Sequence, residues 1–313
     1  PASAALAAAP LRAAPYFMPL ENDPQSIPDI TASGLHQLVL AFVLAPNGGG
    51  CTPTWGGDAA HPVADDTTVT ADVDALRGAG GDVAVSFGGY NGIELGAACG
   101  DASSLAQAYQ QVIDKYALTH IDLDIEGDDL GDATGETKRF QAIKILKQNA
   151  AAAGRSLDVS LTMPVTTIGL SDLDRAEIQR ARDNGADIDI YAAMAFDYGG
   201  PAASMADDVR KVMEDAHAQL VALRPDLSSA EIYARTGLIL MNGHTDQPSE
   251  LFTQDTFTNL LGYATDNHLA RLSFWSLNRD RTCDGTTGWV DGKCSSVTQQ
   301  PYDFARITAQ FAG

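Results

Sequence analysis

Three acidic side chains occupy alternate positions in one short apolar segment of the chain. The segment from 120 to 127 reads HIDLDIEG, so a single leucine or isoleucine separates Asp122 from Asp124 and Asp124 from Glu126. If this segment is a β-strand, the three carboxyl groups lie on one face at a spacing of roughly 7 Å. Carboxyl groups that are close together and shielded from water cannot all ionise, so the pKa of at least one rises. A carboxyl group that keeps its proton near neutral pH can act as a general acid.

Two other interpretations of these acids are weaker. A solvated edge strand could carry alternating acids, but the residues between them are apolar, so the acids are expected to point into the fold. A metal site would need further ligands that converge from elsewhere in the sequence, and none is evident, so we expect no metal. The pattern therefore favours carboxyl groups that are used for catalysis.

Short β-rich segments alternate with amphipathic helical segments from about residue 13 to the end of the chain. The expected strands lie near 13–20, 37–46, 82–89, 119–127, 157–165, 188–198, 235–243 and 270–278. Helical periodicity covers 104–118, 136–153, 204–223 and 254–267, and a last helix is expected near 303–312. This alternation predicts an α/β fold, a single-domain (β/α)8 TIM barrel over 13–313, after a low-complexity, linker-like segment over 1–12. An open doubly wound sheet is the alternative, but no G-x-G-x-x-G turn follows a strand.

The active site of such a barrel forms at the carboxyl ends of the strands. Ser86, Asp197, Asn242 and Trp275 fall late in their expected strands or just beyond them. We therefore expect these side chains to gather around the acids. His120, at the start of the acidic strand, is expected to face away from the acids, and no histidine is a catalytic candidate.

Taken together, these motifs resemble glycoside hydrolase family 18. The fourth strand of that family carries D-x-x-D-x-D-x-E, and the chain matches the last three acids, with Thr119 in place of the first. Residues 86–89 (SFGG) are similar to the family's S-x-G-G, residues 194–197 (MAFD) to its M-x-Y-D, and Trp275 to the tryptophan of its eighth strand. The short interval between strands seven and eight leaves no room for the α+β insertion of some relatives. The resemblance is therefore to the compact bacterial or archaeal type.

The resemblance implies a chitinase that hydrolyses β-1,4 bonds between N-acetylglucosamine units by a retaining, substrate-assisted mechanism. Glu126 would protonate the glycosidic oxygen, Asp124 would orient the acetamido group of the substrate, and Asp122 would hold Asp124 and share its proton. Because the acetamido group is the nucleophile, no cofactor is expected. The expected substrate-binding residues are Asp197, Tyr198, Trp275, Asn242, Ser86 and Met194.

One position departs from the family pattern and leaves alternatives open. Phe196 stands where the family's tyrosine donates a hydrogen bond to the acetamido oxygen. Tyr198 or a residue of another strand could replace this donor, or the enzyme would be slower. The alternative functions are an endo-β-N-acetylglucosaminidase acting on N-glycans and a noncatalytic chitin- or sugar-binding protein. Such binding proteins usually lack the glutamate that is present here as Glu126.

The composition excludes some partners. The chain has 313 residues and a formal net charge of −21, which disfavours binding to nucleic acid or to an anionic membrane surface. No apolar run approaches the ~20 residues of a membrane-spanning helix. We expect a monomer whose partner is chitin or a chito-oligosaccharide.

Four cysteines allow three disulfide pairings. The short interval between Cys283 and Cys294 favours a local bridge, which leaves Cys51 to pair with Cys99. An even count without a C-x-x-C pair favours an oxidising compartment, so we expect secretion. The loops that carry the cysteines also hold two tryptophans that are either part of a sugar-stacking track or anchors of the loops: Trp55 and Trp289.

Overall fold

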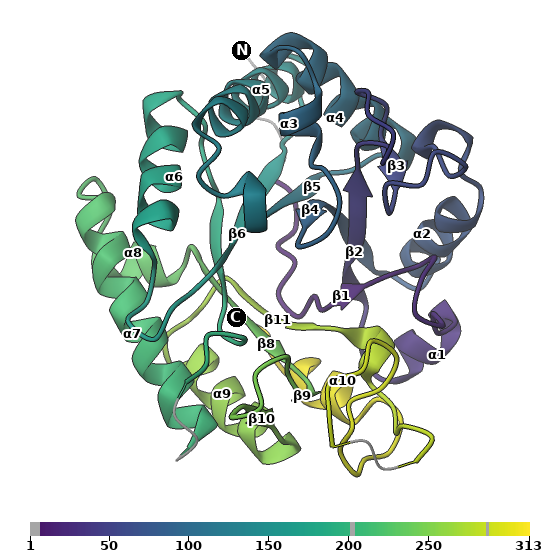
Figure 1. The fold of residues 1–313 in the computed structure, drawn as a ribbon, viewed down its shortest axis with the longest axis vertical. Helices are drawn as coiled ribbons and strands as arrows, with labels where there is room; N and C mark the ends of the chain where they lie inside the picture. Colours follow the sequence, from purple (N-terminus) through teal and green to yellow (C-terminus); the bar gives the residue numbers. More distant parts are fainter. Residues whose placement is uncertain (1–6, 201–203, 286–287) are drawn as a thin grey trace.

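The computed structural model of the chain describes residues 7–200, 204–285 and 288–313. Neighbouring parallel strands follow the order β1, β2, β4, β5, β6, β7, β8 and β11. Their bounds are β1 Tyr16–Phe17, β2 Gln37–Leu44, β4 Asp82–Gly89, β5 His120–Ile125, β6 Asp158–Pro164, β7 Ile190–Met194, β8 Thr236–Met241 and β11 Arg271–Trp275. A parallel bridge between Ala13 and Leu272 joins the segment before β1 to β11 and closes the sheet into a barrel (Figure 1). The predicted single-domain (β/α)8 barrel is confirmed, and each predicted strand range contains one of these eight strands.

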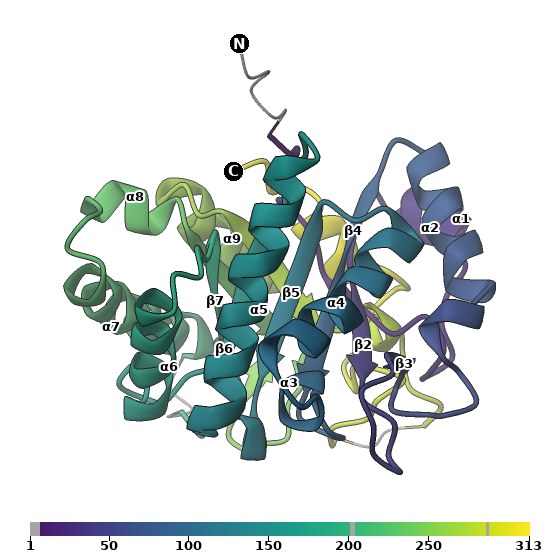
Figure 2. The ribbon, with the colours of Figure 1, turned by 90° about the horizontal axis from the view of Figure 1, so that it is seen from above.

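Helices surround the barrel (Figures 1 and 2). They are α1 Ile27–Ala32, α2 Thr68–Gly78, α3 Leu95–Ala98, α4 Ala102–Tyr116, α5 Ala133–Ala152, α6 Asp172–Asp183, α7 Met205–Leu223, α8 Ser229–Tyr233, α9 Gln254–Asp266 and α10 Asp303–Thr308. Capping boxes at Asp101, Ser171, Ser228 and Thr253 begin α4, α6, α8 and α9, because each side chain accepts a hydrogen bond from an otherwise unpaired backbone N–H. The predicted helices agree with α4, α5, α7, α9 and α10 to within a few residues.

The loops contain only short regular elements. Strand β3 (Thr54–Trp55) pairs antiparallel with β2, and β9 (Gly243–His244) pairs with β10 (Leu251–Phe252). Single 3-10 turns are η1 Val63–Asp65, η2 Gly127–Asp129 and η3 Leu277–Arg279. Turns η2 and η3 directly follow the strands that carry the acids and Trp275.

The strands separate two apolar cores. Ile121, Leu123 and Ile125 pack in the larger core, between the strands and the helices. A smaller core fills the inside of the barrel, mostly with small side chains, and includes Met194. Asp122, which alternates with the outward-facing residues of β5, is therefore buried inside the barrel.

Leu11 and Arg12, at the end of the expected linker-like segment, contact the barrel. Leu11 is 1% exposed and belongs to the interior core, where its carbonyl accepts a hydrogen bond from Arg271 Nε at 3.0 Å. The backbone N–H of Arg12 donates to Gln37 Oε1 at 2.6 Å. Linker character of the segment 1–12 stays a prediction, and residues 1–6 lie outside the described residues.

His120 faces the barrel interior, so the prediction that it faces away from the acids was wrong. Positions 120, 122 and 124 share the parity that places side chains on one face of a strand. His120 is buried, and its Nδ1 lies 3.5 Å from Asp158 Oδ2 of the next strand. Burial, with the nearby charge of Arg271, lowers the pKa of His120 to about 4, so the ring is neutral at physiological pH.

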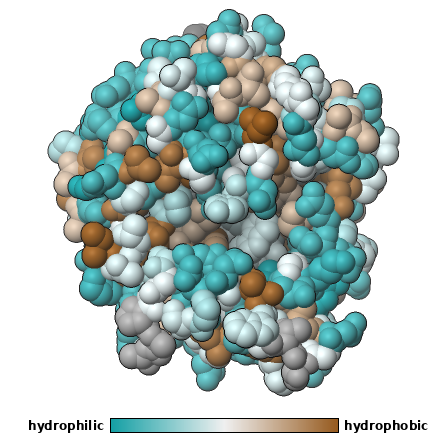
Figure 3. Space-filling model, viewed as in Figure 1, coloured by the Kyte–Doolittle hydropathy of each residue, from teal (hydrophilic) through white to brown (hydrophobic). Residues whose placement is uncertain are grey.

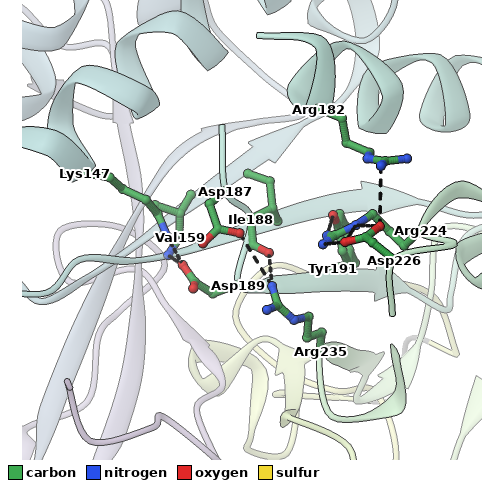
Figure 4. A network of polar contacts seen from close by, with 10 residues as sticks. All are labelled: Lys147, Val159, Arg182, Asp187, Ile188, Asp189, Tyr191, Arg224, Asp226 and Arg235. Carbon is green, nitrogen blue, oxygen red and sulfur yellow. Dashed lines mark hydrogen bonds and ion pairs between the residues drawn. The ribbon is translucent and has the colours of Figure 1, made fainter. Parts of the chain in front are cut away.

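A polar network ties helices to strands at the amino ends of β6 and β7 (Figure 4). Asp189 Oδ2 meets Lys147 Nζ at 2.5 Å and accepts a hydrogen bond from the backbone N–H of Val159 at 2.8 Å. Arg224 and Asp226 form an ion pair at 2.7 Å in the segment after α7. This end of a barrel supports stability, whereas the acids of β5 lie toward the opposite end.

Both predicted disulfides are present. Cys51, in the loop after β2, is bonded to Cys99 at the end of α3, and Cys283 is bonded to Cys294 in the loop after β11. Within the described residues, no helix has the length and apolar character needed to cross a membrane.

Candidate active site

Asp122 is held by hydroxyl groups from three other strands. Its Oδ2 accepts hydrogen bonds from Tyr16 at 2.8 Å and Ser86 at 2.7 Å. Its Oδ1 accepts from Ser160 at 2.5 Å and Thr162 at 2.8 Å. Four donors around two oxygens match the capacity of a carboxylate, which offers acceptors only. Asp122 is thus buried and held in one position next to Asp124 in the strand.

Asp124 and Glu126 are joined to each other. Burial, then the charges of Glu126 and Asp122, raise the pKa of Asp124 well above its ordinary range. Asp124 shares a hydrogen bond with Glu126, and burial also raises the pKa of Glu126. The second oxygen of Asp124, Oδ1, is buried and has no hydrogen-bond partner among the described residues. The pair therefore keeps a proton to a higher pH than isolated carboxyl groups would, and Asp124 hydrogen-bonds to Glu126 rather than to Asp122.

Trp275 lies beside this ladder of acids. Its half-buried indole stacks on Phe42, with ring centroids 5.5 Å apart and planes 9° apart. The ring of Tyr16 is tilted against Trp275 at 5.9 Å, and the same tyrosine donates to Asp122. We call the stacked rings of Trp275 and Phe42 the aromatic platform. Tyr16 therefore links this platform to the carboxyl groups within one site.

The predicted residues Ser86, Asn242 and Met194 lie below the surface of the site. Ser86 is completely buried and binds Asp122. Asn242 is 0% exposed, and its Oδ1 accepts a hydrogen bond from the backbone N–H of Ser276 at 3.0 Å. Met194 packs in the interior core, against which Trp275 also packs. None of the three contacts an acid except Ser86, so contacts of Asn242 and Met194 with a sugar stay predictions.

Asp197 and Tyr198 follow β7 and have different surroundings. The backbone N–H of Asp197 donates to Glu250 at 2.7 Å, and its Oδ1 accepts from the backbone N–H of Asp246 at 2.9 Å. Burial, and then the neighbouring Asp246, raise the pKa of Asp197 to about 7. Tyr198 packs against the core between strands and helices, and burial, then the nearby carboxylate of Asp208 in α7, raise its pKa, while its hydroxyl has no hydrogen-bond partner among the described residues. The phenol of Tyr198 is thus directed at α7.

The tryptophans of the loops have different settings. Trp55 is buried, and its Nε1 donates to the hydroxyl of Tyr116 at 2.9 Å, so it is an anchor of its loop. Trp289 is 67% exposed, and Tyr90, directly after β4, is 75% exposed. Viewed down the barrel, apolar side chains are scattered among hydrophilic ones around the mouth (Figure 3).

Sequence reasoning missed several residues that position the acids. Tyr16, Ser160 and Thr162 all bind Asp122, and Phe42 supports Trp275. A signal was present in β6, where Ser160 and Thr162 alternate with apolar residues in the same way as the acids of β5. Polar residues at matching parity on adjacent buried strands indicate a shared interior site.

Comparisons with known proteins agree with this geometry. A scan against models of protein families finds no match. The chain is 29% identical over 91% of its length to the probable bifunctional chitinase/lysozyme of Escherichia coli (strain K12), and it spans about a third of that protein, 33%. It is 28% identical to active domain 2 of the chitinase from Pyrococcus furiosus, with 95% of this chain and 93% of that chain covered at a TM-score of 0.84. The chain is thus similar, over most of its length, to chitinases of the kind grouped in glycoside hydrolase family 18.

A family GH18 chitinase from Chromobacterium violaceum has the same fold at 17% identity, with a TM-score of 0.62 over 95% of this chain and 82% of that one. Compared with the motif of glycoside hydrolase family 18, this chain keeps the acids Asp122, Asp124 and Glu126 and differs at Thr119 and Phe196. Asp122 has four hydroxyl partners within the barrel, so the absence of an acid at Thr119 leaves it fully hydrogen-bonded.

Proposed function

We propose that the chain is a chitinase that hydrolyses β-1,4 bonds between N-acetylglucosamine units with retention of anomeric configuration. The observation that carries this proposal is the hydrogen-bonded Asp124 and Glu126 pair, in which burial raises both pKa values. The raised pKa favours the protonated form of Glu126, which is the form a general acid needs.

The substrate supplies the nucleophile in this proposal. Glu126 protonates the oxygen of the scissile bond while the acetamido oxygen of the cleaved sugar attacks the anomeric carbon from the opposite face. Asp124 orients the acetamido N–H and stabilises the cyclic cation that forms. Glu126 then removes a proton from water, which opens the cyclic intermediate, and two inversions give net retention.

Asp122 keeps Asp124 in place. Because hydroxyl groups saturate both oxygens of Asp122, its side chain is fixed and its charge is held close to Asp124. The negative charge of Asp122 opposes release of a proton from Asp124 to a bound substrate group. The same charge stabilises a cation that forms above Asp124. Ser86 therefore acts through Asp122 rather than as a sugar contact.

The sugar contacts in this proposal are Trp275, Asp197 and Met194. Trp275 offers an indole face supported from behind by Phe42, and sugars bind to such faces through their apolar C–H surfaces. Tyr198 is directed at Asp208, so it does not replace the hydroxyl missing at Phe196 in this conformation. Orientation of the acetamido group then depends chiefly on Asp124, and a slower reaction follows.

The relatives support the substrate class and the setting. The same domain of the Pyrococcus furiosus chitinase, in catalytic-site mutants, has been described in complex with chito-oligosaccharides. The two disulfides suit an oxidising compartment, so we propose that the protein acts outside the cell. The net charge of −21 supports a neutral polysaccharide rather than nucleic acid or an anionic membrane as its partner, and the monomer is part of the same proposal.

The test is cleavage of chitin oligosaccharides and colloidal chitin by the protein and by Glu126→Gln. Asp128→Asn is the matched control, because Asp128 is exposed and lies two residues away in the same loop. We expect short oligosaccharides from the parent protein and from Asp128→Asn, and loss of at least ~10³-fold in kcat for Glu126→Gln. Cleavage of N-glycans without cleavage of chitin would favour the endo-β-N-acetylglucosaminidase instead, and tight oligosaccharide binding without cleavage would favour a binding protein.

A further inference from the structure

Arg279 is a buried cation that hydrogen-bonds to the backbone of Trp275. It ends turn η3, which follows β11 and Trp275, and it is 1% exposed. Its hydrogen bonds go to carbonyl oxygens rather than to a carboxylate. Burial lowers the pKa of Arg279 to about 10, so the side chain stays charged at neutral pH.

The guanidinium group of Arg279 joins three separate segments. Its Nη1 donates to the backbone carbonyl of Asn242 at 2.7 Å, to Asn242 Oδ1 at 3.1 Å and to the carbonyl of Trp275 at 3.4 Å. Its Nε donates to the carbonyl of Asp291 at 2.7 Å, and its Nη2 donates to the carbonyl of His244 at 2.5 Å. These carbonyls belong to the segment after β8, to the end of β11 and to the loop closed by the second disulfide.

Asn242 also hydrogen-bonds to the backbone around Trp275. Its Oδ1 also accepts a hydrogen bond from the backbone N–H of Ser276, and the backbone N–H of Asn242 donates to the carbonyl of Trp275 at 3.3 Å. Two N–H donors thus meet Oδ1, which fixes which side-chain atom of Asn242 is the oxygen. The backbone on both sides of Trp275 is therefore tied to Arg279 and Asn242.

A charged group without a carboxylate partner is costly to bury unless its N–H groups are satisfied. Carbonyl oxygens satisfy Arg279 here, and hydrogen bonds to a charged donor are stronger than those between neutral groups. The planar fork of arginine presents donors in several fixed directions, whereas lysine has one nitrogen atom and cannot reach three segments at once. The contacts consequently require arginine rather than any cation.

We propose that Arg279 is a positioning residue for the aromatic platform: it fixes the backbone of Trp275 and ties it to Asp291, in the part of the Cys283–Cys294 loop that the structure describes. Arg279 does not touch the substrate. It acts through Trp275, so its loss weakens sugar binding more than it slows the chemistry at Glu126. This inference rests on the proposed function for its kinetic test, but its structural half is testable without catalysis.

The kinetic test uses Arg279→Lys, with Arg281→Lys as the matched control. Arg281 lies two residues away and also binds backbone carbonyls, those of Asn278, Asn22 and Asp23, but none of the segment after β8. For Arg279→Lys we expect KM for a chito-oligosaccharide to rise about tenfold, while kcat stays within about twofold. Arg281→Lys should leave both unchanged. A fall in kcat with unchanged KM, or equal effects of the two substitutions, would overturn the positioning role.

The link to the disulfide loop is tested by combining variants. Replacing both Cys283 and Cys294 with serine should raise KM in the parent protein, because Asp291 then holds Arg279 less firmly. In the Arg279→Lys background the same replacement should raise KM no further, since the connection is already lost. If the two changes multiply, the loop and the platform are independent.

Fluorescence separates this inference from the proposed function. In a protein with Trp55→Phe and Trp289→Phe, Trp275 is the remaining tryptophan. Arg279→Lys should increase acrylamide quenching of Trp275 at a temperature where circular dichroism shows the variant folded, and Arg281→Lys should not. Unchanged quenching would contradict the inference even if the enzyme cleaves chitin. Absence of chitin cleavage by the parent protein would contradict the proposed function and leave the quenching result to decide the inference.

Discussion

The hydrogen bonds that hydroxyl groups donate to Asp122 predict that alanine substitutions at two buried serines of the barrel change the free energy of unfolding differently. Ser86 donates to Asp122 Oδ2 at 2.7 Å, so Ser86→Ala leaves a buried carboxylate short of one donor. Ser273, on β11, is also buried, but its hydroxyl has no hydrogen-bond partner among the described residues. Both substitutions remove one oxygen atom from a strand, so they form a matched pair.

The magnitudes follow from the partners. A hydrogen bond to a charged group contributes about 1.5–3 kcal/mol, so Ser86→Ala should lower the free energy of unfolding by ~2 kcal/mol. Removal of the unpaired hydroxyl of Ser273 should be neutral or slightly stabilising. For a domain of this size, ~2 kcal/mol corresponds to a fall in Tm of about 4 °C.

Thermal unfolding followed by circular dichroism measures both variants under the same buffer conditions. We expect Ser86→Ala to unfold at a lower temperature than Ser273→Ala, with kcat also reduced for Ser86→Ala because Asp122 loses part of its support. If the two substitutions lower Tm equally, or if Ser273→Ala is the more damaging, the assignment of Asp122 as a charge held by hydroxyl donors is refuted.

Three further predictions concern stability. Asp189→Ala at the amino end of the barrel removes the partner of Lys147 and of the Val159 N–H. Unfolding in urea should show a free energy of unfolding lower by about 1–2 kcal/mol, with kcat unchanged. A loss of activity at full stability would argue against the separation of the two barrel ends. The pKa of Asp197 is raised to about 7, and those of Asp129, Asp158 and Asp280 to about 6, chiefly by burial. The folded state binds these protons more tightly than the unfolded chain, so the stability present below pH 4 is lost as the pH rises through 6 to 7. Tm should therefore be lower at pH 8 than at pH 5. Asp197→Asn should make the change in Tm above pH 6 smaller. Replacing Cys51 and Cys99 with serine opens a loop of 48 residues and should cost about 4 kcal/mol, against ~3 kcal/mol for Cys283 and Cys294 with 11 residues, and equal losses in guanidinium unfolding would contradict the chain-entropy argument.

The strands, the barrel and the acidic ladder could be predicted because each depends on a local pattern. Asp122, Asp124 and Glu126 alternate with apolar residues, and that alternation alone determines which face the acids occupy. The same rule places His120 on the acidic face, so the error there came from its application. Both disulfides also followed from spacing along the chain.

The direction of Tyr198 could not be predicted in this way. Strand β7 ends at Met194, and Asp197 has a positive φ of 59°, so the alternation of side chains does not extend to Tyr198. The chain turns there because Glu250, distant in sequence, accepts the backbone N–H groups of Asp197 and Gly199. A local pattern cannot contain that contact.

The contacts of Arg279 with the backbone of Trp275 could not be predicted from the sequence for a related reason. Apart from Asn242 Oδ1, its partners are backbone carbonyls, which every residue possesses, so no residue type in the sequence marks them. Only the register of β8 beside β11 brings Asn242 to Trp275. Likewise, the donors from Ser160 and Thr162 became recognisable once β6 was known to lie next to β5.

The most direct test of the account is the anomeric configuration of the first product, recorded by proton NMR before mutarotation. The parent protein is mixed with a chito-oligosaccharide, and the new reducing end is observed within the first minutes. An acid at Glu126 with the acetamido group as nucleophile predicts the β-anomer. Initial formation of the α-anomer would contradict the account, because it would require direct attack of water on the anomeric carbon and a base that the ladder of Asp122, Asp124 and Glu126 does not provide.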